Sequence, residues 1–313
     1  MTRSLAKKPF SLLCILCLLV VNCRVRESWQ TTTLLFFDTV CEVRLLGSPS
    51  GFENGQKEVA RTFSEIEQYF SPGTAPLSSP LVSNLFQKAR QVFLDSDGDF
   101  DITVAPLSRI WGFRHNSHRI PSPEEIQAAL NHVGMNKIST AKGILILLPQ
   151  MELDWGGIAK GLGIDLAVQS LKKLGFSNGL INLGGDLFCW GKNPDSQPWK
   201  IGIQHPRKSG FLGVLNISDL GVATSGDYQR YFEINGIRYP HIFNPKTGYP
   251  ARDNQSVTVI GPETTLCDAL STALFVSRHP EGILNKYPDY GAIIVDKEGT
   301  VFLLGKRYPM EIF

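Results

Sequence analysis

Hydrophobic residues recur at intervals of three and four in several stretches of the chain, the spacing that gathers side chains on one face of a helix. In residues 55–69 these positions are Val59, Phe63 and Ile66. The segment Ser122-Pro123-Glu124-Glu125 opens another helix, because serine caps a helix start and proline suits its first position. The sequence also predicts helices over residues 81–94, 158–174 and 264–276.

Alternation of apolar and polar residues predicts strands between these helices. In residues 34–46, for example, Val43 and Leu45 flank Arg44. A short buried strand is expected at 144–148, others at 180–183, 199–204, 213–217 and 256–260, and a closing hairpin from 292–295 and 301–304. Because helices and strands do not alternate strictly, the order predicts an α+β fold rather than a doubly wound sheet.

The first segment has the pattern of an export signal. Arg3, Lys7 and Lys8 precede the apolar run 10–21, which is too short to span a membrane comfortably but suits a signal peptide. Cys23 follows the run, as in a bacterial lipoprotein signal, where this cysteine becomes the lipidated first residue. The alternative is a signal peptide, cleaved elsewhere or not at all, with a chance cysteine.

The composition of the chain limits the classes of protein to which it could belong. Hydrophobic residues make up 42% and charged residues 19% of the 313 residues, an ordinary globular balance. The net charge is +2, part of it in the leader, which excludes the basic stripe of a nucleic-acid binder. Beyond the leader, Cys41, Cys189 and Cys267 are too few and too far apart for a disulfide framework or a zinc site. We expect buried free thiols.

Two glycine pairs are candidate ligand-binding turns. Gly156-Gly157 leads into a predicted helix whose first turn carries Lys160. The free N–H groups of a helix start favour phosphate, and Lys160 adds a positive charge. The segment Asn182-Leu183-Gly184-Gly185-Asp186 ends a strand and permits close ligand approach. Taken alone, the first pair is also compatible with an ordinary helix cap and the second with a bulge or hairpin turn.

Two further segments combine hydroxyls, a carboxylate and a histidine. Residues 223–228 place Thr224, Ser225, Gly226 and Asp227 in a predicted turn. Further along, His241 precedes a loop rich in proline and glycine. A histidine there can serve as a general base or bind phosphate, although a lone histidine is more often structural.

Asp268 and Thr272 lie four residues apart in the predicted helix 264–276, and therefore share one helix face. A carboxylate and a hydroxyl at this spacing can bind one hard cation such as Mg²⁺. The alternative is that Asp268 caps the helix and Thr272 bonds to the preceding turn. Asp268 lies several residues inside the helix, where a cap is less natural.

Taken in this order, these segments resemble motifs of the ApbE family, the FAD:protein FMN transferases. They are Gly-Gly-Ile-Ala-Lys-Gly at 156–161, Asn-Leu-Gly-Gly-Asp at 182–186, Thr-Ser-Gly-Asp-Tyr at 224–228, the loop from His241 through Thr247 and Gly248, and Asp-Ala-Leu-Ser-Thr-Ala at 268–273. The stretch 98–107 is also similar to a family segment. Several motifs in one order are far more specific than any one of them.

The resemblance implies a mixed α/β fold related to T-fold domains. The chain is therefore expected to consist of a signal peptide at 1–22, a polar tether at 23–33 and an FAD-binding catalytic domain at 34–313. The resemblance also implies a Mg²⁺ site formed by Asp268, Thr272 and the backbone carbonyl of Ala159. It implies FAD contacts from Lys160, Asp186, Ser225, Gly226, Asp227, His241 and Thr247. The residues implied in catalysis are His241, Asp268 and Lys160.

The implied reaction is Mg²⁺-dependent cleavage of the FAD diphosphate. FMN passes to a threonine of an exported or membrane redox protein, and AMP leaves. Attack by water would make the protein an FAD diphosphatase, and a flavin-binding lipoprotein without chemistry is the alternative of another class. The implied location is the periplasmic face of the inner membrane, reached through a lipid anchor.

Two positions depart from the family pattern. Residues 72–80 are short and lack a Ser-rich stretch ending in Asn, which helps to cover the flavin, and a more open site would favour hydrolysis. Asn244 stands where Asp is usual, which removes one carboxylate near His241.

Overall fold

The computed structural model describes residues 27–70, 77–114 and 117–313. The leader with Cys23, and residues 72–76 of the segment that departs from the family pattern, lie outside the described residues. None of the helices within the described ranges is both long and apolar enough to cross a membrane.

An eight-stranded sheet of antiparallel neighbours, in the order β1-β2-β5-β6-β9-β12-β13-β14, forms the centre of the fold. Its strands are β1 (Ser28–Phe36), β2 (Thr39–Gly47), β5 (Gly179–Leu183), β6 (Asp186–Trp190), β9 (Leu220–Gly226), β12 (Asn254–Gly261), β13 (Gly291–Asp296) and β14 (Val301–Gly305). Smaller sheets contain β7 (Trp199–Gln204), β8 (Phe211–Ile217) and β15 (Met310–Ile312), then β10 (Tyr231–Ile234) with β11 (Ile237–Pro240), and β3 (Ser139–Ala141) with β4 (Ile144–Ile146).

Seven α-helices and one 3₁₀ turn occur in the described part of the chain. They are α1 (Pro49–Phe70), α2 (Pro80–Asp95), α3 (Ala105–Ile110), α4 (Pro123–Leu130), η1 (Met135–Lys137), α5 (Ala159–Lys173), α6 (Thr264–Val276) and α7 (Pro280–Leu284). The capping box at Ser122 confirms the predicted start of α4, and α6 has the predicted bounds.

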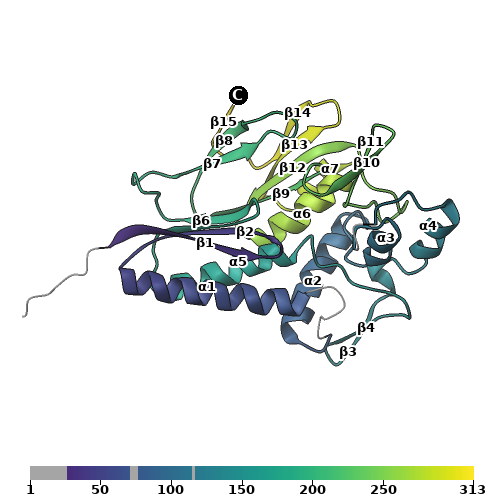
Figure 1. Cartoon of the computed structure of the whole chain (residues 1–313), viewed down its shortest axis with the longest axis horizontal. Coiled ribbons are helices and arrows are strands. Elements are labelled where there is room, and N and C mark those ends of the chain that lie inside the picture. Colours follow the sequence, from purple (N-terminus) through teal and green to yellow (C-terminus); the bar gives the residue numbers. More distant parts are fainter. Residues whose placement is uncertain (1–26, 71–76, 115–116) are drawn as a thin grey trace, which may run out of the picture.

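The large sheet is the middle one of three layers (Figure 1). On one face α6 packs on β9 and β12, α5 packs on α6, and α1 packs on α5. On the other face, Trp199 and Ile201 of the small sheet share a hydrophobic core with Val222 and Ile293 of the large one. A separate cluster around Trp111 and the other aromatic residues joins α3 and α4 to β10 and β11. The expected α+β class is confirmed.

The first strand region differs from its prediction. The single strand expected at 34–46 is two strands, because Phe37 and Asp38 adopt positive φ angles of 52° and 55° and turn the chain back. Residues 28–33, expected to be tether, form most of β1, whose threonines pair with 42–44 of β2. The polar composition of this stretch concealed a β-branched edge strand.

Two other segments were misjudged. β4 lies at the predicted place, but the side chains of Ile144 and Ile146 are exposed and only Leu145 is buried. Residues 223–226, expected to form a turn, belong to β9. Their small side chains are needed there because α6 packs directly on this strand. The predicted state of the thiols is confirmed, since Cys41, Cys189 and Cys267 are free and buried.

Candidate active site

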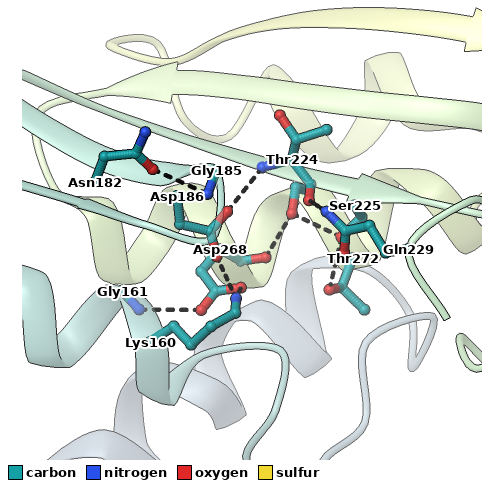
Figure 2. Close-up of polar contacts among 11 residues, drawn as sticks. Lys160, Gly161, Asn182, Gly185, Asp186, Thr224, Ser225, Gln229, Asp268 and Thr272 are labelled. Atoms are coloured by element: carbon teal, nitrogen blue, oxygen red, sulfur yellow. Dashed lines mark hydrogen bonds and ion pairs between the residues drawn. The ribbon is translucent and has the colours of Figure 1, made fainter. Parts of the chain in front are cut away.

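The start of α5, the end of β9 and the middle of α6 meet beside the turn between β5 and β6 (Figure 2). This turn consists of Gly184 and Gly185, both with positive φ, so the glycine pair does make a hairpin turn. Asp186 follows as the first residue of β6 and points toward Lys160 of α5. The motifs at 156–161 and 182–186 therefore belong to one site.

Lys160 lies between two buried carboxylates. Its ammonium pairs with Asp186 and lies 3.5 Å from Oδ1 of Asp268. Asp186 also accepts a 3.0 Å hydrogen bond from the amide of Thr224, and Asp268 accepts one of 3.1 Å from the amide of Gly161. Burial disfavours the ammonium, but the two carboxylates outweigh it and raise the pKa of Lys160. Lysine therefore stays charged here.

The surroundings of Asp268 disfavour the ionised form of its carboxyl group. Burial raises the pKa of its carboxyl to about 7; Lys160 opposes the rise and Asp186 adds to it. Two carboxylates thus share one lysine in a buried place. A further positive charge beside Asp268 would favour its ionised form.

Hydroxyl groups surround the outer side of this cluster. Ser225 Oγ lies 2.8 Å from Ser271 Oγ and 3.1 Å from Thr272 Oγ1. A Cβ atom built on Gly157 would lie 3.1 Å from Thr272 Oγ1, so the glycine turn also borders this hydroxyl. Asp268 and Thr272 share one helix face as predicted, and neither has the alternative role, because the Asp268 carboxylate bonds to α5 and Thr272 bonds to β9.

The donor set fits a hard divalent cation. Within the described ranges, no group of three or more His, Cys, Asp or Glu residues could hold a metal ion. A cation here would therefore depend on hydroxyl and backbone oxygens in addition to Asp268, which is the chemistry that Mg²⁺ accepts. Thr272 supplies such a hydroxyl, and Ala159, the first residue of α5, is adjacent to Lys160.

His241 lies beside the aromatic cluster, with its ring centroid 6.4 Å from that of Phe113. Its backbone N–H and its Nδ1 both lie 3.1 Å from the carbonyl oxygen of Arg230. Since a carbonyl only accepts, Nδ1 carries the proton and Nε2 is left with a free lone pair. Burial and the positive charge of Arg230 lower the pKa of His241 to about 4.

Other candidate residues lie outside this cluster. Asp227 is held by a bidentate ion pair with Arg207, at 2.8 and 2.5 Å, and lies 3.6 Å from Arg238. The exposed Thr247 accepts a hydrogen bond from the amide of Tyr249. Gly226 packs against the ring of Tyr228, which a Cβ atom would approach to 2.5 Å.

Asn244 performs a structural role that an aspartate could also fill. Its Oδ1 accepts hydrogen bonds from the amides of Lys246 and Thr247, at 2.9 and 3.1 Å. This closes the loop that follows His241. The departure from the family pattern at this position therefore preserves the turn.

Sequence reasoning missed Ser271, Arg207 and Arg230. Ser271 is within a motif that was recognised, but its side chain was not singled out although it bonds to Ser225. Arg207 lies in the loop between β7 and β8, far in sequence from Asp227, and nothing in the local pattern marks it. Arg230 contributes its backbone carbonyl, which no side-chain pattern reveals.

Comparison with known proteins agrees with this geometry. The sequence model of the ApbE family matches residues 38–293.

The chain belongs to the ApbE family.

Among curated relatives it is similar to an FAD:protein FMN transferase of Haemophilus influenzae, with 38% identity over 192 residues that cover 58% of this chain and 56% of that protein. The match to the FAD:protein FMN transferase of Treponema pallidum has 30% identity over 326 residues and covers 91% of this chain and 89% of that protein. The chain thus spans just over half the length of the first relative and most of the second. A crystal structure of the ApbE protein of Thermotoga maritima aligns with a TM-score of 0.82 at 28% identity, covering 88% of this chain and 97% of that one.

Proposed function

We propose that this ApbE-family protein is an FAD:protein FMN transferase that depends on Mg²⁺. The observation that carries the proposal is the placement of Lys160 between Asp186 and Asp268, beside the paired hydroxyls of Ser225 and Thr272. A lysine, a histidine base and an oxygen-rich cation site are the parts that attack on a diphosphate requires. The names of the two curated relatives supply the substrate class.

In the proposed reaction the acceptor hydroxyl, that of a threonine in an exported or membrane redox protein, attacks the phosphorus on the FMN side of FAD. Its oxygen forms the new phosphoester bond, the bond to the AMP phosphate breaks, and AMP leaves. The free Nε2 of His241 accepts the hydroxyl proton, since its low pKa keeps the ring neutral. Lys160 offsets the charge of the diphosphate from a fixed position.

Mg²⁺, held by Asp268, Thr272 and the backbone carbonyl of Ala159, would supply further positive charge at the phosphates when bound. The shared lysine supports this assignment, because a buried carboxyl that shares one lysine with a second carboxylate would be stabilised in its ionised form by another cation. Ser225 keeps the Thr272 hydroxyl oriented through its 3.1 Å contact.

The test is incubation of the protein with FAD and Mg²⁺, with and without an acceptor domain that carries the target threonine. Flavin bound covalently to the acceptor, and absent from a threonine-to-alanine acceptor, is the expected result. Release of AMP and FMN at the same rate without an acceptor would instead identify an FAD diphosphatase. FAD that stays intact in both arms would leave only a flavin-binding protein.

We also propose that Cys23 carries a lipid that anchors the domain at the periplasmic face of the inner membrane. The support is the position of this cysteine directly after the apolar run 10–21 and its preceding basic residues. Radiolabelled fatty acid should be incorporated by the full chain and not by Cys23→Ala. Equal incorporation by the two would end this proposal.

A further inference from the structure

Helix α6, which carries Asp268 and Thr272, has no cap of its own. Glu263 occupies the N-cap position without a side-chain hydrogen bond to the helix. The first backbone N–H groups of a helix lack intrahelical partners and carry a partial positive charge, so they need an acceptor from elsewhere. This acceptor comes from a different helix.

The acceptor is Asp165 of α5. Its Oδ1 accepts the amide of Thr264 at 2.9 Å, and its Oδ2 accepts the amide of Thr265 at 2.8 Å and the Thr265 hydroxyl at 2.6 Å. A single carboxylate therefore holds three donors of the first turn of α6. Since Asp165 belongs to the same helix as Lys160, the lysine and the start of α6 share one rigid support.

A second contact ties the two helices one turn further along. Gly161 of α5 donates its amide to Asp268. The backbones are in close contact here, since a Cβ atom on Gly161 would lie 2.4 Å from the carbonyl oxygen of Thr264. Each residue of α-helix advances 1.5 Å and rotates by about 100°. If α6 were anchored on Asp165 through residues one position earlier or later in the chain, Asp268 and Thr272 would turn away from Lys160 and Ser225.

We propose that Asp165 is a positioning residue for the cation-binding face of α6. It fixes the residue at which α6 begins and thereby holds Asp268 and Thr272 in the register that a divalent cation requires. The inference rests on the proposed cation site. Asp165 itself bonds to the helix start and touches neither Asp268 nor Thr272 in any hydrogen bond of the described residues.

The matched control is Asp95, a carboxylate that also ties two elements together. It accepts hydrogen bonds from Gln91 Nε2 and from the Tyr287 hydroxyl, both at 2.8 Å, and so links α2 to the segment after α7. Loss of either carboxylate removes hydrogen bonds between two elements, and loss of Asp95 also removes an ion pair with Lys286 at 3.5 Å. Only the loss of Asp165 changes what holds the start of α6.

The experiment measures Mn²⁺ binding to the whole folded protein without FAD, by electron paramagnetic resonance of the free ion. It also measures the Mg²⁺ dependence of AMP release and the Tm. We expect Asp165→Ala to weaken Mn²⁺ binding at least tenfold. It should raise the Mg²⁺ concentration for half-maximal AMP release by a similar factor, and saturating Mg²⁺ should largely restore kcat.

Asp165→Asn keeps one acceptor oxygen, so its Mn²⁺ affinity should lie between those of Asp165→Ala and the wild type. Asp95→Asn should lower the Tm and leave Mn²⁺ binding within twofold of the wild type.

Thr265→Val is the milder variant for the case in which Asp165→Ala does not fold, because it removes one donor and keeps the branched side chain. It should weaken Mn²⁺ binding about threefold. A fall in Tm with unchanged Mn²⁺ binding in the Asp165 and Thr265 variants, or equal weakening in Asp95→Asn, would overturn the inference. A wild type that fails to bind Mn²⁺ would overturn it too, whereas Mn²⁺ binding without AMP release would contradict the proposed function alone.

Discussion

The amide of Gly161 and the carboxylate of Asp268 are joined by a 3.1 Å hydrogen bond, although 107 residues separate them in the chain. The bond exists because glycine lets α5 approach α6 until the backbones touch. It fixes one carboxylate oxygen of Asp268, while the other lies 3.5 Å from Lys160. The orientation of the proposed cation ligand therefore depends on a residue without a side chain.

Gly161→Ala should displace Asp268. The new Cβ would lie 2.4 Å from the carbonyl oxygen of Thr264, a backbone atom that moves only if a whole helix moves. We expect a loss of about 1–3 kcal/mol in unfolding free energy, typical of overpacking, and a large loss of AMP release. Denaturant unfolding and the FAD assay measure the two effects. Gly282→Ala is the control, because no atom lies within 4 Å of a Cβ in that helical position. If Gly161→Ala were as stable and as active as Gly282→Ala, the prediction would be contradicted.

Removal of the Lys160 charge should make the protein depend on divalent cations for stability. Lys160→Met leaves the carboxylates of Asp186 and Asp268 buried without their counter-charge. Breaking such a pair costs about 3 kcal/mol, and added Mg²⁺ should restore part of it. Thermal unfolding with and without Mg²⁺ gives the measurement. Lys246→Met removes an exposed partner of Asp97 and Asp99 and should cost at most about 1 kcal/mol. Lack of any Mg²⁺ effect in Lys160→Met would count against the cation site.

Asp268→Asn keeps the shape of the side chain and removes its charge. Because Asp268 is the one carboxylate proposed to bind the cation, AMP release should fall on the order of 10²–10³-fold, the range seen when a single electrostatic group is removed from an active site. Thr272→Val should have a smaller effect in the same direction. Initial rates at several Mg²⁺ concentrations measure both. Asp289→Asn, at an exposed pair with Lys306, serves as the control, and full activity of Asp268→Asn would refute the assignment.

Protonation of His241 should weaken the fold in mildly acidic solution. Its pKa is about 4 in the folded protein and about 6.5 in an unfolded chain. Between these values the ring binds more protons in the unfolded chain, so the contribution of His241 to stability falls as pH decreases from about 6.5 to about 4. In His241→Phe this part of the pH dependence should disappear. Denaturant titrations at several values between pH 4 and pH 7 test it, with the exposed His279→Phe as the control. An unchanged slope in His241→Phe would show that the ring is not held neutral.

The local patterns predicted some parts of the site and could not predict others. The spacing of Asp268 and Thr272 within an apolar stretch gave the correct helix and the correct shared face, since both properties are local. The meeting of Lys160 with Asp186 and Asp268 joins residues 26 and 108 positions apart. No local period encodes such contacts, and only the resemblance to a family brought these residues together beforehand.

The errors in the predicted secondary structure also come from contacts between residues that are distant in sequence. Residues 223–226 are small and hydroxylated, which is typical of a turn, but the close packing of α6 makes small residues necessary in a central strand. The cap of α6 could not be inferred from its own sequence, because Asp165 supplies it from another helix. A signal was present nonetheless: Asp165 is a charged residue in the otherwise apolar run Leu-Gly-Ile-Asp-Leu-Ala-Val at 162–168.

If Cys23 is lipidated as proposed, the early start of β1 limits how far the domain can extend from the membrane. Strand pairing begins at Ser28, so five peptide units separate the sheet from Cys23. At roughly 3.6 Å per residue, the linker can extend at most about 18 Å. With Cys23 lipidated as proposed, the domain would be held against the bilayer surface rather than suspended above it. The height at which an acceptor protein must present its threonine would then be set by the dimensions of the domain itself and not by the linker.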